Sequence, residues 1–113
     1  APMKNRFMLA PLTNQQSHAD GTLSDDEYRW LTMRAEGGFG LTMTCAAHVQ
    51  KGGQAFEGQL GIWSDAHLPG LARLAGSIRA NGSLSAVQLG AEPSPLSEPQ
   101  YTKILPASAT PVS

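Results

Sequence analysis

The sequence has little that would build a metal centre, a disulfide framework or a nucleic-acid interface. Its single cysteine, Cys45, and its three histidines exclude an intramolecular disulfide and a thiolate-rich metal site. Lys and Arg number 8 against 9 Asp and Glu, for a net charge of -1, which leaves no basic surface large enough to neutralise a phosphate backbone. The apolar runs are far shorter than the ~20 residues that cross a bilayer, and no charged-then-apolar leader opens the sequence. We therefore expect a cytoplasmic protein whose partners include neither nucleic acid nor membrane.

Glycine and proline divide the 113 residues into two parts. All 12 glycines lie in residues 1–90, whereas most of the 8 prolines lie in residues 91–113. Proline at this density removes backbone donors and blocks helix formation. We therefore predict an ordered unit over residues 1–90, followed by a Pro-rich extended loop or arm over residues 91–113.

Three short apolar runs have the composition of buried strands. They lack the alternation of apolar and polar residues that marks a sheet with one wet face. They cover residues 6–10, 40–46 and 84–89. The first run stops at Pro11, and we expect this strand to be buried on both faces.

Two helices are predicted between these strands. The first begins at Ser24, with Glu27 three residues later in the spacing of a capping box. It ends at Gly37-Gly38, where a left-handed conformation is accessible. The second begins at residues 64–65 and ends at Asn81-Gly82, with apolar residues at helical spacing between them.

The order strand, helix, strand, helix, strand predicts parallel pairing with helices packed outside the sheet. Ligands bind at the carboxyl ends of such strands, whether the sheet is open or closed into a barrel. Those ends carry Thr13, Ala46 and Gln88, which offer a hydroxyl, a backbone N–H and a carboxamide. Together these groups could bind the edge of a flat heteroaromatic ring; the alternative is that each only satisfies nearby loop backbone. Neither a Walker loop nor a glycine fingerprint joins the first strand to its helix.

Five separated segments, in this order and at these spacings, resemble the start of the Old Yellow Enzyme family of flavin-dependent ene-reductases. They are NRFMLAPLT at residues 5–13, the Asp20-Gly21 turn, EGGFGL at residues 36–41, GIWSD at residues 61–65 and AVQL at residues 86–89. The resemblance covers about residues 4–90. It implies an α/β fold that is a partial (β/α)8 TIM barrel: the first three strands and two helices, plus an extended loop.

The resemblance also implies an activity and a cofactor. In the family, hydride passes from NADH or NADPH to N5 of non-covalently bound FMN, and from there to the β-carbon of an activated alkene. The cofactor-binding residues that it implies are Ala10, Pro11, Leu12, Thr13, Ala46 and Gln88. Thr13 would bind near flavin O4, the Ala46 N–H would bind the O4/N5 side, and Gln88 would bind O2 and N3 of the pyrimidine edge. Gln15 would approach the substrate, and no metal is implied.

The sequence departs from the family pattern after the third strand. The family continues its Gln-Leu into His-Ala-Gly or His-His-Gly, whereas Gly90-Ala91-Glu92-Pro93 follows here. The family's substrate-anchoring pair, tyrosine proton donor and phosphate-binding arginine would all lie beyond this stretch, so no catalytic residue is assigned. Barrels of this type take ~250 residues to close, and we expect a complementary chain to carry the remaining strands. The competing hypothesis is a non-catalytic fragment or assembly partner that binds no cofactor by itself.

The other reactive side chains have structural interpretations. Cys45 is expected to be a small buried core residue rather than a thiol near the flavin. His18, His48 and His67 have no metal-ligand spacing, and His67 is expected in a solvated first turn. Helix capping accounts for the carboxylates of residues 25–27 without a catalytic role.

Overall fold

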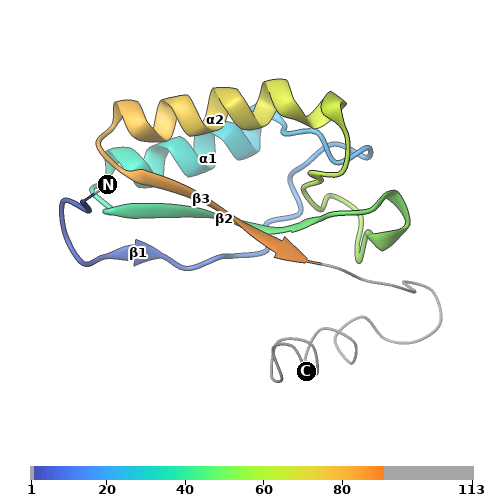
Figure 1. The fold of residues 1–113 in the computed structure, drawn as a ribbon, viewed down its shortest axis with the longest axis horizontal. Coiled ribbons are helices and arrows are strands. Elements are labelled where there is room, and N and C mark those ends of the chain that lie inside the picture. Colours follow the sequence, from blue (N-terminus) through green and yellow to red (C-terminus); the bar gives the residue numbers. More distant parts are fainter. Residues whose placement is uncertain (1, 91–113) are drawn as a thin grey trace.

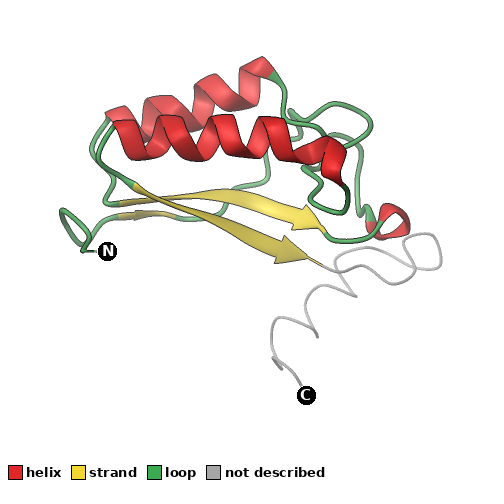
Figure 2. Ribbon diagram, turned by 45° about the horizontal axis from the view of Figure 1, so that its top comes forward, coloured by secondary structure: helices red, strands yellow, loops and turns green. Residues whose placement is uncertain are grey.

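The computed structural model describes residues 2–90, and these form one three-stranded parallel sheet with two helices. The strands are β1 (Met8–Leu9), β2 (Leu41–His48) and β3 (Leu84–Gly90), in the spatial order β1-β2-β3. The helices α1 (Asp25–Glu36) and α2 (Leu68–Ala80) both pack on the same face of the sheet (Figures 1 and 2). The predicted βαβαβ order and α/β class are confirmed. The predicted arm at residues 91–113 lies outside the described residues.

The core lies between the helices and the sheet. Its main cluster comes from both helices and β1: Leu9, Leu31, Ala35, Leu74 and Ile78. Each is less than one-tenth exposed, and burying such side chains contributes roughly 1.5–3 kcal/mol apiece for the larger ones. A second cluster under the end of β2 contains Cys45, Ala47 and Leu60. The predicted core position of Cys45 is therefore confirmed.

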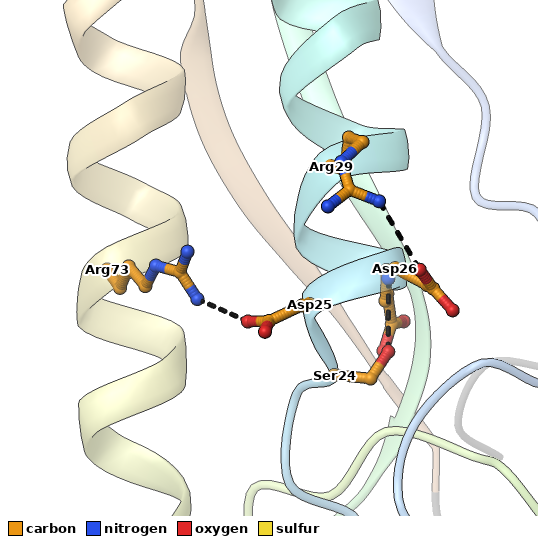
Figure 3. Close-up of polar contacts among 6 residues, drawn as sticks. Ser24, Asp25, Asp26, Arg29 and Arg73 are labelled. Carbon is orange, nitrogen blue, oxygen red and sulfur yellow. Dashed lines mark hydrogen bonds and ion pairs between the residues drawn. The ribbon is translucent and has the colours of Figure 1, made fainter.

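Helix α1 begins where its sequence predicts. The Ser24 Oγ accepts a hydrogen bond from the Glu27 backbone N–H at 3.0 Å, which satisfies one of the free donors of the first turn (Figure 3). Arg73 of α2 donates to the Asp25 carboxylate at 2.9 Å and lies over the Tyr28 ring, 3.7 Å from its centroid. These exposed contacts join two helices that already share the buried core.

Two short 3-10 helices complete the described elements. The first is η1 (Lys51–Gly53), in the loop after β2. The second is η2 (Asp65–His67), which leads directly into α2 and is capped by Ser64. The predicted second helix therefore starts with a 3-10 turn before it becomes α-helical.

Strand β1 departs from its prediction in length and in burial. Only Met8–Leu9 pair with β2, and Phe7 is 69% and Met8 is 50% exposed. The expectation of burial on both faces is therefore wrong for residues 2–90, because helices cover only one face and β1 has a strand on only one side. The remaining strands each extend one or two residues further than predicted.

Within residues 2–90, neither helix combines the length and the apolar composition that a bilayer-spanning helix needs.

Candidate functional site

The residues predicted at the strand ends share one rim of the sheet. Ala46 and Gln88 are register partners in the β2–β3 ladder. Leu9 pairs with Thr42, and Thr13 lies in the segment that continues from β1. In Figure 1 the chain after β1 runs alongside β2 toward this same end. The structure thus pairs Ala46 with Gln88 at the carboxyl ends of β2 and β3, and places Thr13 in the segment that follows β1 toward the same end of the sheet.

The backbone N–H and C=O groups of Ala46 point away from β3. His48, two residues later, donates its N–H to Leu60 and accepts from Ile62 on that side, at 2.9 and 3.0 Å. Alternate residues of an extended strand direct their backbone groups to the same side. The Ala46 carbonyl accordingly accepts from the Gln59 side chain at 2.9 Å rather than from β3. The Ala46 N–H is therefore directed to the side of the sheet on which Thr13 lies.

Two side chains at the rim are open to solvent. Thr13 and Gln88 are both exposed, and among residues 2–90 neither the Thr13 hydroxyl nor the Gln88 carboxamide has a hydrogen-bond partner. The half-buried Ala46 adds almost no side-chain bulk between them. The rim can therefore offer a hydroxyl, an N–H and a carboxamide to one flat ligand.

Gln15 lies in the loop after Thr13 and has a left-handed backbone, with a φ of 53°. Gly58 packs against it so closely that a Cβ at Gly58 would lie 2.5 Å from the Gln15 carbonyl oxygen. The Ser17 N–H donates to the Gly58 carbonyl at 3.1 Å. This loop is therefore held against the segment that follows β2, and the Gln15 side chain is exposed beside a polar surface depression.

The interpretation that helix capping accounts for residues 25–27 is incomplete for Glu27. Its N–H is capped by Ser24 as expected, but its carboxylate is fully buried and accepts from Ser17 Oγ and, at 3.8 Å, from Cys45 Sγ. Burial raises the pKa of Glu27 above its ordinary value, against the opposing effect of these hydrogen bonds. Capping alone does not account for Glu27, which joins the loop after β1 to α1 and β2.

Cys45 is a structural thiol. Desolvation, reinforced by the nearby Glu27 charge, raises its pKa to about 11. The thiolate that reactive cysteines need is thus strongly disfavoured. Its side chain contacts Glu27 of α1, so it lies on the helix side of the sheet and not at the rim.

The expectation for His67 is wrong. It is only 3% exposed, and its ring bonds to the Asp20 carbonyl at 2.9 Å and to the Ser64 hydroxyl at 3.0 Å. The turn at residues 20–21 folds over the start of η2 and excludes water, which local spacing does not reveal. No group of three or more potential metal-ligating side chains occurs within the described part of the chain.

Two positions at this end of the sheet escaped the sequence-based analysis. Thr44 and Gln59 are buried, and their side chains bond to the backbone around Ala46 and Gln88. A threonine in a strand is an ordinary β-former, and a glutamine in a loop is usually solvated. Neither position therefore carried a signal in the sequence.

Comparison with known proteins gives consistent results. Residues 1–111 match the sequence model of the NADH:flavin oxidoreductase / NADH oxidase family. A probable NADH-dependent flavin oxidoreductase of Bacillus subtilis, YqiG, is 38% identical over 87 residues, which are 77% of this chain and 23% of that protein. This chain therefore spans about a quarter of that curated relative's length.

Solved structures show the same partial overlap. A complex of 2-naphthoyl-CoA reductase with 2-naphthoyl-CoA aligns with a TM-score of 0.74 at 34% identity, over 77% of this chain and 13% of that one. The Old Yellow Enzyme homologue of Zymomonas mobilis aligns with a TM-score of 0.71 at 28% identity, over 77% of this chain and 24% of that one. The three strands and two helices thus correspond to the first part of larger TIM barrels.

Proposed function

The chain belongs to the NADH:flavin oxidoreductase / NADH oxidase family, and on that premise we propose that it supplies part of the FMN site of an ene-reductase of the Old Yellow Enzyme type. The observation that carries this proposal is the common rim formed by Thr13, Ala46 and Gln88. When bound there, FMN supplies the chemistry of hydride transfer between NADH or NADPH and an alkene conjugated to a carbonyl or nitro group.

The residues of the rim fit a flavin by their chemistry. An isoalloxazine ring is flat and has acceptors and a donor along its pyrimidine edge. The Gln88 carboxamide can donate to one such group and accept from another. The Ala46 N–H and the Thr13 hydroxyl can donate to the O4/N5 side. Donors there stabilise the electron-rich reduced ring and raise its potential.

Other residues of the first loop have supporting roles. We propose that Ala10, Pro11 and Leu12 pack against the ring, since they join the end of β1 to Thr13. Gln15 extends toward the substrate from a loop that Gly58 and Ser17 hold in place. The catalytic acid and the substrate anchors are not among the residues assigned.

The rest of the barrel comes from a complementary chain or from a longer form of this polypeptide. Two observations support this proposal. The relatives are about four times as long as the matched region, and apolar side chains such as Phe7, Met8 and Leu89 are at least half exposed in residues 2–90. Further strands would cover them, as in closed barrels of this type.

The test is the colour and activity of the protein with its barrel completed. A flavoprotein absorbs near ~450 nm and oxidises NADH or NADPH when an activated alkene is added. Yellow protein without alkene-dependent oxidation would retain the FMN site and reject the ene-reductase activity. Colourless protein that stays colourless with added FMN would reject both and favour a non-catalytic assembly partner.

A further inference from the structure

Strand β2 contains one residue more than β3 requires. Met43 pairs with Ala86, but Ala46 pairs with Gln88, so three steps along β2 match two steps along β3. This is a β-bulge, and the pattern of buried residues along β2 changes at the same place. Thr42 and Thr44 are buried before the bulge, whereas Cys45 and Ala47 are buried after it. The alternation of buried and less buried side chains along β2 therefore shifts by one residue between Thr44 and Cys45.

The bulge decides which residues meet at the rim. With regular pairing from Met43 onward, Ala46 would lie opposite Leu89 and not opposite Gln88. Its side chain would then lie on the same face of the sheet as those of Thr42 and Thr44, which are buried on the helix side. Bulges commonly redirect side chains beside active sites in this way.

Two buried polar side chains hold this irregular backbone. The Thr44 hydroxyl donates to the Cys45 carbonyl at 2.8 Å and accepts from the Gln88 N–H at 3.4 Å, and so bridges the two strands at the bulge. The Gln59 carboxamide donates to the Ala46 carbonyl at 2.9 Å and accepts from the Ala55 N–H at 2.7 Å. Thr44 and Gln59 are 4% and 3% exposed, so water does not replace these bonds readily.

We propose that Thr44 and Gln59 are positioning residues of the FMN site, which fix the bulge that places the Ala46 N–H beside the Gln88 carboxamide. The proposal rests on the proposed function, because it needs FMN at this rim. Neither residue has to touch the flavin. Thr44 acts through the Gln88 backbone, to which it adds a second contact across the bulge. Gln59 acts through the Ala46 backbone, whose carbonyl points away from β3 and takes its hydrogen bond from the Gln59 side chain.

The test compares matched variants of the intact FMN-loaded protein. Thr44→Val removes the hydroxyl with little change of shape, and Thr44→Ser restores it. Thr42→Val is the control, because the Thr42 hydroxyl is also buried on β2 and bonds to Ser83 at 2.9 Å, but lies away from the rim. Gln59→Glu keeps the acceptor for Ala55 and loses the donor to the Ala46 carbonyl.

The readouts are the FMN dissociation constant, the visible spectrum of the bound flavin and the thermal midpoint of the apoprotein. We expect Thr44→Val and Gln59→Glu to weaken FMN binding about tenfold and to shift the flavin spectrum, with Thr44→Ser close to wild type. We expect Thr42→Val to lower the thermal midpoint without changing FMN affinity or the spectrum.

The outcomes separate this inference from the proposed function. Wild-type protein that binds no FMN would overturn both. Wild-type protein that binds FMN, with Thr44→Val and Gln59→Glu no weaker than Thr42→Val, would overturn the positioning role alone. Equal loss of FMN affinity in the Thr44 and Thr42 variants would also overturn it, since that result indicates a general effect of stability.

Discussion

The helix side of the sheet and the rim at its carboxyl end are built differently. On the helix side, Leu31, Ala35, Leu74 and Ile78 are at most 2% exposed and pack against one another. At the rim, Thr13 and Gln88 are exposed, and their side-chain polar groups have no partner among residues 2–90. The difference indicates that the residues that stabilise the fold are separate from those that we propose to bind the ligand. Substitutions can therefore test whether the two functions are separable.

The largest expected effect is on the helix side. Leu31→Ala should lower the free energy of unfolding by about 2–5 kcal/mol, because a cavity remains in the core. The FMN affinity of the molecules that stay folded should not change. Urea unfolding measures the first effect and flavin titration the second. Met33→Ala is the control, since Met33 lies on the same helix but is 53% exposed. If the folded fraction of Leu31→Ala bound FMN more weakly than wild type, the two regions would be coupled.

A substitution at the rim should have the opposite result, with an effect on FMN binding and little effect on stability. Gln88→Leu should weaken FMN binding by about 1–3 kcal/mol, because polar groups of the ring edge lose their partner. Stability of the apoprotein should be nearly unchanged, since the Gln88 side chain is exposed. Equilibrium dialysis against FMN measures the loss, with Ser85→Ala on the same strand as the control. Unchanged affinity would remove Gln88 from the site.

Glu27 links the two regions and should show itself in the pH dependence of stability. Since burial raises the pKa of Glu27 in the folded state above the ordinary 4.5, the folded protein holds this proton more tightly than the unfolded chain does. The resulting stabilisation is complete below the unfolded pKa and is lost as pH rises through the folded pKa.

Glu27→Gln keeps the shape of the side chain and removes the titration. The stability of wild type relative to Glu27→Gln should therefore fall as the pH rises above about 4.5 and through the raised pKa of the folded state, as measured by urea unfolding at a series of pH values. Asp26→Asn is a suitable control, because its carboxylate is exposed on the same turn. A constant difference between wild type and Glu27→Gln would contradict the raised pKa.

The smallest effect is expected for the exposed ion pair between the helices. Arg73 lowers the pKa of Asp25, yet the two side chains are 53% and 79% exposed, and such pairs contribute little in water. Asp25→Asn should leave both the thermal midpoint and FMN binding within experimental error of wild type. A clear loss of stability that disappears in high salt would show that the pair matters more than its exposure indicates.

Local sequence signals predicted much of the fold. The start of α1 at Ser24 follows from capping chemistry within one turn, and the βαβαβ order follows from the apolar runs. These signals depend on residues close together in the chain. The three rim positions were placed by the same logic, because carboxyl ends of parallel strands share an edge.

The errors arose where distant segments meet. The burial of Glu27 depends on Ser17 and Cys45, and that of His67 depends on the Asp20 turn. The bulge at Thr44 depends on the register between two strands. No local pattern encodes these contacts, so periodicity and spacing could not reveal them.

Among residues 2–90, β1 forms one edge of the sheet, which has a consequence for the order of folding. Strand β1 pairs with only two residues of β2, and in an eight-stranded ring its other side meets the final strand of the barrel. Joining them closes a loop of nearly the whole domain, and the entropy lost grows with the logarithm of its length. We expect this seam to form late, so that the rim around Thr13 acquires its final shape only after the other strands are assembled.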